Sequence, residues 1–144
     1  MVRAVLAVIG SYVLMFVLLF LCFTGVYLTL GVNFAFRPGV YDVSHRWLAM
    51  ALAVNFVVPA IAGLVCAAIA KGGRAPIAFA VLVLAVGLLL GALKGQPQGP
   101  NVRTGDVPNI EAMQHARNPV WAVFGMPFVA AIGVLVGSRL RRKS

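Results

Sequence analysis

The chain consists of long apolar stretches separated by short polar segments. Four stretches contain no charged side chain: residues 4–36, 47–70, 75–93 and 118–138. A helix needs roughly 17 to 25 predominantly apolar residues to cross a bilayer. The pattern therefore predicts four transmembrane helices, at about residues 4–31, 47–70, 76–93 and 119–138.

Composition places the chain in the same class. Of its 144 residues, 62% are hydrophobic and 10% are charged, whereas roughly a quarter of the residues in a soluble domain are charged. We therefore expect an all-α integral membrane protein, in which residues 1–144 form a single four-helix bundle. The first apolar run far exceeds the roughly 7 to 15 residues of a signal-peptide core, so the first helix is expected to be retained.

The basic residues predict an orientation. Four spans put both termini on one side, together with seven basic residues and no acid: Arg3, Lys71, Arg74, Arg139, Arg141, Arg142 and Lys143. The other five of the twelve basic residues share the opposite side with all three acids. Because basic loops favour the cytoplasm, we expect a multi-pass protein of the bacterial cytoplasmic (inner) membrane. Both termini are then cytoplasmic, and two ordered loops are extracytoplasmic.

Few polar signals interrupt the predicted spans. Ser44 is a suitable N-cap for the second helix, and Pro59 and Pro127 are expected to kink the second and fourth. No span contains an ionisable residue other than cysteine or tyrosine, which argues against an ion-coupled carrier. The strongest polar residue within a span is Asn55, which we interpret as an interhelical hydrogen-bonding group or, alternatively, a ligand contact.

Small residues mark possible contact faces on the helices. Two glycine pairs have the four-residue spacing that lets helix backbones approach closely: Gly87 with Gly91, and Gly133 with Gly137. The pairs can pack inside the bundle or against another subunit. We select these four glycines as candidate interface residues.

The loop of residues 94–118 is rich in glycine and proline in its first half. Its second half offers Asn109 as a cap for a short helix over about residues 111–117. We expect Ile110 and Met113 of this segment to lie against the membrane surface or a partner, and count them as interface candidates. Long ordered loops of this kind often carry function.

Four polar residues in the two loops could approach one another: Asp42, His45, Glu111 and His115. They are suitable metal ligands, but their spacing matches no known site and arginines stand close to both histidines. We therefore expect no metal and interpret the four as capping and ion-pairing groups. His45, His115 and Asn55 are weaker candidates for contact with a cofactor.

The favoured function is a non-enzymatic accessory or structural subunit of a larger bacterial membrane complex. It would dock on other membrane subunits through its small-residue faces and the 94–118 loop. One alternative is a module that binds a lipid, quinone or pigment, and another is a holin or a toxin-immunity protein. Membrane lipids are expected partners. The net charge of +9 reflects a shortage of acids and has no accompanying basic stripe, so no nucleic-acid partner is expected.

Overall fold

A computed structural model describes residues 1–71, 73–95, 97 and 99–143 of the chain. Within this part the helices are α1 (Val2–Leu30), α2 (Val32–Ala35), α3 (His45–Ala70), α4 (Ala75–Lys94), α5 (Asn109–His115) and α6 (Val120–Lys143). The described residues form no strand. Two isolated β-bridges join Phe36 to Val43 and Asp42 to Arg117.

The prediction of four long apolar helices is confirmed, and the chain is an all-helical membrane protein. α1, α3, α4 and α6 are each long and apolar enough to cross a membrane. The largest difference in bounds is at the end of α6, which continues beyond the predicted end at 138 to Lys143. The last turn of α6 is basic, and such side chains end an apolar span without breaking the helix, because their long stems reach towards polar surroundings.

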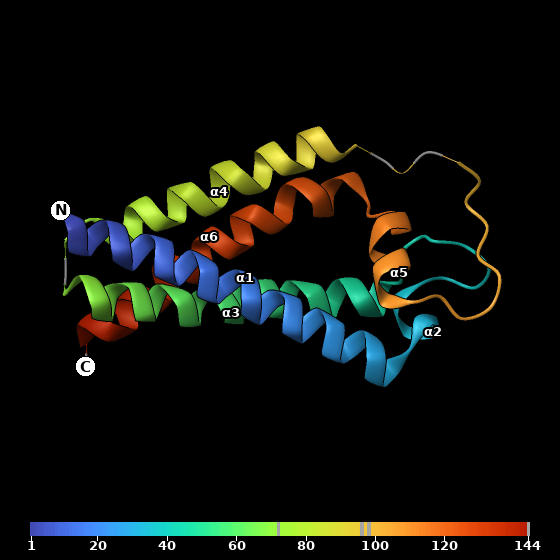
Figure 1. Cartoon of the computed structure of the whole chain (residues 1–144), viewed down its shortest axis with the longest axis horizontal. Helices are drawn as coiled ribbons and strands as arrows, with labels where there is room; N and C mark the ends of the chain where they lie inside the picture. The colour runs from blue at the N-terminus through green and yellow to red at the C-terminus, as the bar shows by residue number, and fades with distance from the viewer. Residues whose placement is uncertain (72, 96, 98, 144) are drawn as a thin grey trace.

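The four long helices run along one axis, so that their ends form two groups (Figure 1). We call the end with both chain termini the termini end. The opposite end holds α2, α5 and the segments 31–44 and 99–119, and we call it the loop end. At the termini end, Arg3 donates a hydrogen bond to the Ile69 carbonyl and Arg142 donates one to the Gly73 carbonyl.

The most extensive contact between two helices is that of α3 with α6, which crosses α3 near the termini end and separates from it towards the loop end (Figure 1). Glycines make this approach possible. A Cβ atom on Gly133 would lie 2.5 Å from the carbonyl oxygen of Phe56, and one on Gly137 would overlap the carbonyl of Ala60. Any larger residue at these positions must therefore separate the two helices.

The second glycine pair seats α4 on α6. A Cβ atom on Gly87 would lie 2.7 Å from the ring of Pro127, and one on Gly91 would lie 2.9 Å from Cγ1 of Val123. Pro127 stands inside α6, where its missing N–H leaves the carbonyl of Val123 without its usual helical partner. All four predicted glycines thus face a neighbouring helix of the same chain.

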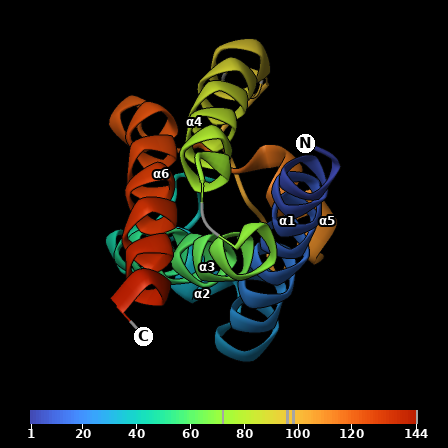
Figure 2. The same cartoon turned by 90° about the vertical axis from the view of Figure 1, so that its left-hand side faces the viewer.

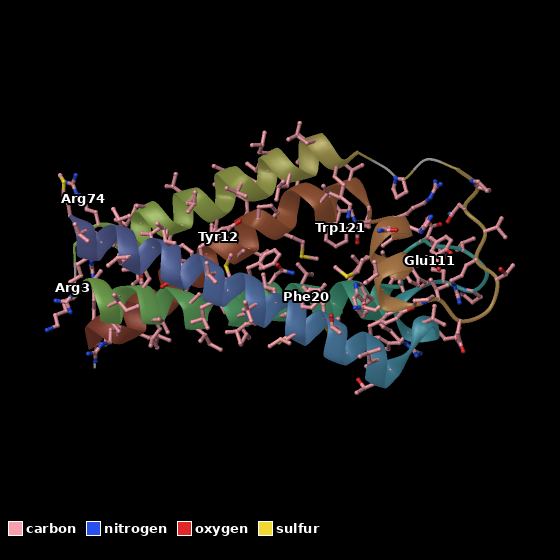
Figure 3. All side chains as sticks on the ribbon, viewed as in Figure 1. Arg3, Tyr12, Phe20, Arg74, Glu111 and Trp121 are labelled. Carbon is pink, nitrogen blue, oxygen red and sulfur yellow. The ribbon has the colours of Figure 1, made fainter. Side chains whose placement is uncertain are left out.

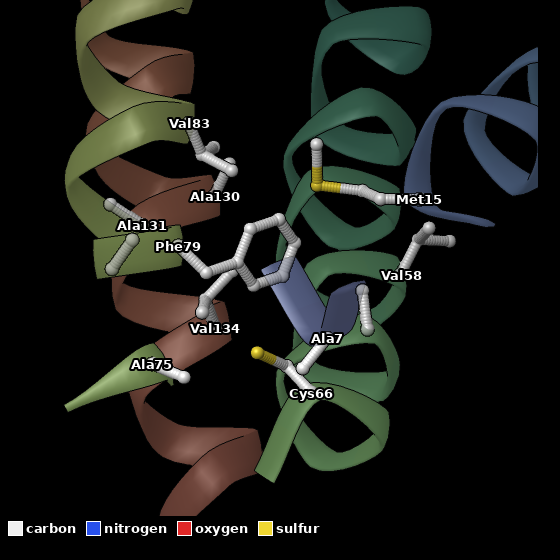
Figure 4. Packing of buried hydrophobic residues seen from close by; sticks show 12 residues of the cluster. Ala7, Met15, Val58, Cys66, Ala75, Phe79, Val83, Ala130, Ala131 and Val134 are labelled. Atoms are coloured by element: carbon white, nitrogen blue, oxygen red, sulfur yellow. The ribbon is translucent and has the colours of Figure 1, made fainter. Parts of the chain in front are cut away.

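A compact apolar core fills the half of the bundle near the termini end. Phe79 of α4 is fully buried at its centre, with Val134 of α6, Cys66 of α3 and Ala7 of α1 around it (Figure 4). The outward faces of the four long helices expose many large apolar side chains. This distribution is that of helices which pack on one face and meet lipid on the other.

The loop end is held together by hydrogen bonds between its two segments. Arg103 is 9% exposed, and its guanidinium donates to the carbonyls of Val40, Gly105 and Arg37, each at 3.3 Å. The Arg103 backbone N–H donates to Gly39. A buried arginine therefore connects the 99–108 segment to the 31–44 segment.

The short helix α5 begins two residues before the predicted position. Asn109 is its first residue and Pro108 precedes it as the N-cap, so the expectation that Asn109 caps this helix is wrong. The Asn109 side chain instead donates to Oγ1 of Thr24 on α1 at 3.1 Å. This bond, together with one from the Tyr27 hydroxyl to the Val107 carbonyl, joins the α5 region to the last turns of α1.

Candidate functional site

The main hollow of the described structure lies between α1 and α4, in the half of the bundle nearer the loop end. It consists of two adjoining cavities of about 420 and 350 Å³. The cavities share five lining residues: Phe16, Leu19, Lys94, Ala116 and Asn118. We call the joint space the lateral groove. Each cavity falls within the range of about 300 to 1,000 Å³ that is usual for small-molecule sites.

The groove exists because its two walls pack on different partners. α1 contacts α3, whereas α4 is seated on α6 through Gly87 and Gly91. The two walls share the core around Phe79 and diverge towards the loop end (Figures 1 and 2). Parts of α3 and α6, including Ala51 and Pro127, form the floor of the opening.

Two polar side chains line the groove well inside the span of the helices, Tyr12 and Asn55. Asn55 donates to the carbonyl of Ala51 on its own helix at 2.9 Å, so the predicted interhelical hydrogen bond is not the one that forms. Pro59 also leaves the Asn55 carbonyl without an N–H donor in the helix. Within the described residues the Tyr12 hydroxyl makes no hydrogen bond. Figure 3 shows Tyr12 near the middle of the bundle.

The part of the groove nearest the loop end has an aromatic wall. Trp47, at the start of α3, lies with its ring centroid 5.8 Å from Phe23 and 6.4 Å from both Tyr27 and Phe34. The amino group of Lys94 is the one charged group among the described lining residues of both cavities. The groove therefore changes from apolar at depth to mixed polar and aromatic at its mouth.

The predicted metal candidates do not form a cluster. The described residues contain no group of three or more His, Cys, Asp or Glu side chains placed to share a metal ion. Asp42 accepts a hydrogen bond from Asn101 at 3.1 Å. Nδ1 of His115 lies 3.0 Å from the backbone oxygen of Glu111, and the His115 ring stacks on Tyr41 at 5.2 Å.

The predicted interface residues fall into two groups. The four glycines are occupied by contacts between helices of this chain, which leaves them no free face for a partner. Ile110 is 69% exposed and Met113 is 48% exposed, and Met113 also lines the mouth of the groove. The apolar groups of this region that the fold buries are Val107 and Ala112.

Sequence reasoning missed Tyr12, Lys94 and Arg103. Tyr12 stands in an unbroken apolar run, Lys94 ends such a run, and Arg103 lies in a Gly/Pro-rich segment without periodicity. None of these contexts distinguishes a residue that lines a groove, or a buried arginine that joins two loop segments, from an ordinary residue at the membrane interface. Asn55 was detectable, because it is the strongest polar side chain inside a span.

No known protein family matches the chain, and neither does a curated protein or a solved structure. The functional argument therefore rests on the geometry of the lateral groove.

Proposed function

We propose that this protein binds a lipid-like molecule (a membrane lipid, a quinone or a pigment) in the lateral groove and does not transform it chemically. The observation that carries the proposal is the groove itself, which lies between α1 and α4 and is lined by Tyr12 and Asn55 at depth. Apolar ligands enter sites of this size when a few polar groups fix their orientation.

The polar groups of the groove favour a bound ligand. An amide or hydroxyl without a partner in an apolar environment costs about 1 to 3 kcal/mol on the scale of protein mutational data. The Tyr12 hydroxyl and the remaining hydrogen-bonding groups of the Asn55 side chain would recover this energy from a ligand that carries a carbonyl or hydroxyl group. Met15 and Leu19 line the same cavity and would contact the apolar part of the ligand.

The charge distribution also supports a proposal for the membrane in which the protein lies and for its orientation there. The termini end carries seven basic residues and no acid, which supports cytoplasmic termini in a bacterial inner membrane by the positive-inside rule. The loop end would then be extracytoplasmic, and the mouth of the groove would open in the outer leaflet.

Mass spectrometry of solvent extracts of the purified protein tests the proposal. We expect one lipid-class species at close to one molecule per chain, far above its share of the membrane extract. Ala51→Phe fills the floor of the groove and should lower the bound amount at least tenfold. Ala53→Phe, the same change at an exposed position of α3, is the matched control and should retain the ligand.

A second variant covers the case in which Ala51→Phe does not fold. Asn55→Leu nearly preserves volume and removes the amide, so it should fold and still lose most of the ligand. If the wild-type protein carries only bulk lipids, in the ratios of the surrounding membrane, the proposal fails.

The accessory-subunit role is a second candidate. It is favoured by Ile110 and Met113, which expose apolar side chains on α5 beside the mouth of the groove. A helix of another membrane subunit would occupy the groove in place of a lipid and cover these two residues. A near-stoichiometric protein that co-purifies with wild type and with Ala53→Phe, but not with Ala51→Phe, would establish this candidate instead.

A further inference from the structure

A third pocket opens at the loop end between the first turns of α3 and α6, next to the lateral groove, with which it shares Val43 and Asn118. Its volume is about 430 Å³. The lining residues that matter here are Arg37, Asp42, His45, Leu48, Arg117 and Trp121. We call this space the polar pocket. None of these six residues lines the lateral groove.

The walls of the polar pocket carry an excess of cationic groups. Two guanidinium groups, those of Arg37 and Arg117, face a single carboxylate, that of Asp42, and Asp42 already accepts a hydrogen bond from Asn101. In the described part of the chain neither guanidinium forms an ion pair. Arg37 makes no side-chain hydrogen bond there, and Arg117 makes one, to the carbonyl of Gly99 at 2.8 Å.

Unpaired guanidinium groups in a pocket favour an anion. A guanidinium offers five N–H donors in a planar fork that matches the oxygens of a phosphate group. The pocket also lies at the amino ends of two long helices, α3 and α6, whose dipoles add to the attraction.

The other side of the pocket is apolar. Leu48 and Trp121 line it on the first turns of α3 and α6, and Trp121 is 57% exposed. Exposed tryptophan at the end of an apolar helix is typical of the membrane–water interface. A pocket with arginines on one side and interface-level apolar groups on the other fits an amphipathic anion better than a free one.

We infer that the polar pocket binds the phosphate group of an anionic phospholipid from the leaflet that adjoins the loop end. The phosphate lies between Arg37 and Arg117, and the glycerol and first methylenes lie along Leu48 and Trp121. The pocket adjoins the lateral groove at Val43 and Asn118, but its charged groups differ: Arg37, Asp42 and Arg117 line the pocket, and Lys94 lines the groove.

Native mass spectrometry of the purified full chain, titrated with phosphatidylglycerol or phosphatidylcholine, tests the inference. We expect phosphatidylglycerol to bind about tenfold more tightly, because phosphatidylcholine carries the same phosphate together with a quaternary ammonium group, which the guanidinium groups of the pocket repel. Arg37→Gln together with Arg117→Gln should reduce the preference to within about twofold. Arg46→Gln removes one charge at the neighbouring exposed position outside the pocket and should leave the preference intact.

Two further variants belong to the same binding measurement. Arg37→Gln alone removes no hydrogen bond within the described chain, so it should fold and still lose several-fold of the preference. Ala51→Phe should leave phosphatidylglycerol binding unchanged, which separates this site from the proposed ligand of the groove.

Three outcomes would overturn the inference. One is equal binding of the two lipids by the wild-type protein. Another is an effect of Arg46→Gln as large as that of Arg37→Gln, which would indicate diffuse attraction to the whole surface. The third is displacement of phosphatidylglycerol by inorganic phosphate at equal concentration, which would make the pocket a site for a free anion.

Discussion

At the scale of single residues, Arg103 shows how a charge can be structural. Its guanidinium is buried against three backbone carbonyls and lies 6.0 Å from the centre of the Phe36 ring. Carbonyl oxygens and an aromatic face compensate for part of the hydration that burial removes. Arg103 therefore joins the two loop segments, and it does so without a carboxylate partner among the described residues.

Replacing Arg103 should loosen the loop end. Arg103→Ala removes three charge-assisted hydrogen bonds, and we expect a loss of about 2 kcal/mol in stability. Arg103→Lys should recover only part of it, because an ammonium group cannot reproduce the fork. Thermal unfolding in detergent, with Arg46→Ala as an exposed control, measures the effect. Equal melting temperatures for the two alanine variants would refute the role of Arg103.

Glu111 and His115 provide the opposite case. Both are exposed, whereas Val107 and Ala112 of the same region are buried at 8% and 3% exposure. We expect Glu111→Gln with His115→Gln to change stability by less than about 1 kcal/mol. Val107→Asp should cost about 3 kcal/mol or more, because it places a carboxylate in an apolar contact. A double glutamine variant that folds normally but loses ligand or partner would make these two residues functional.

At the scale of helices, the spans were predictable because a charge inside a bilayer is costly. The absence of charged residues over four stretches is a direct consequence of that cost. Glycine spacing likewise indicated which faces pack. The start of α5 was misplaced because Asn109 carries the signature of a cap, yet tertiary contact with Thr24 uses its side chain elsewhere.

The α3–α6 contact yields a matched pair of glycine variants on one helix. A Cβ atom on Gly137 would overlap the Ala60 carbonyl, whereas one on Gly125 meets nothing within 4 Å. Gly125→Ala should be neutral or stabilising by up to about 1 kcal/mol, since alanine is the better helix former. Gly137→Ala should destabilise by about 1 to 3 kcal/mol through overpacking. Melting temperatures compare the two, and equal shifts would contradict the packing described for α3 and α6.

At the scale of the whole molecule, function depends on a shape that no single segment encodes. The lateral groove arises because α1 packs on α3 while α4 packs on α6. The divergence of these two pairs depends on contacts between residues far apart in the sequence. Hydrophobic patterning identifies four helices but not the angles between them. Asn55 was therefore recognisable as an unusual residue, while the space that it faces was not.

The orientation of the whole molecule can be tested through its tail. Neutralising Arg139, Arg141, Arg142 and Lys143 removes four of the seven basic residues at the termini end, leaving three against five at the loop end. The positive-inside rule then favours inverted or mixed insertion. A C-terminal reporter should show a mixed population in the variant. A reporter that stays uniformly cytoplasmic would mean that other features determine the topology.

Site-specific photo-crosslinking tests the central claim, occupation of the lateral groove by a lipid-like ligand, most directly. A photoreactive phenylalanine analogue replaces Leu19, which lines both cavities, or Ile132, which is 54% exposed on α6 and lines neither. After irradiation of intact membranes, intact-mass measurement identifies the adducts. The account predicts one defined lipid-class adduct at position 19 and a mixture of bulk lipids at position 132. The same mixture at both positions would contradict it.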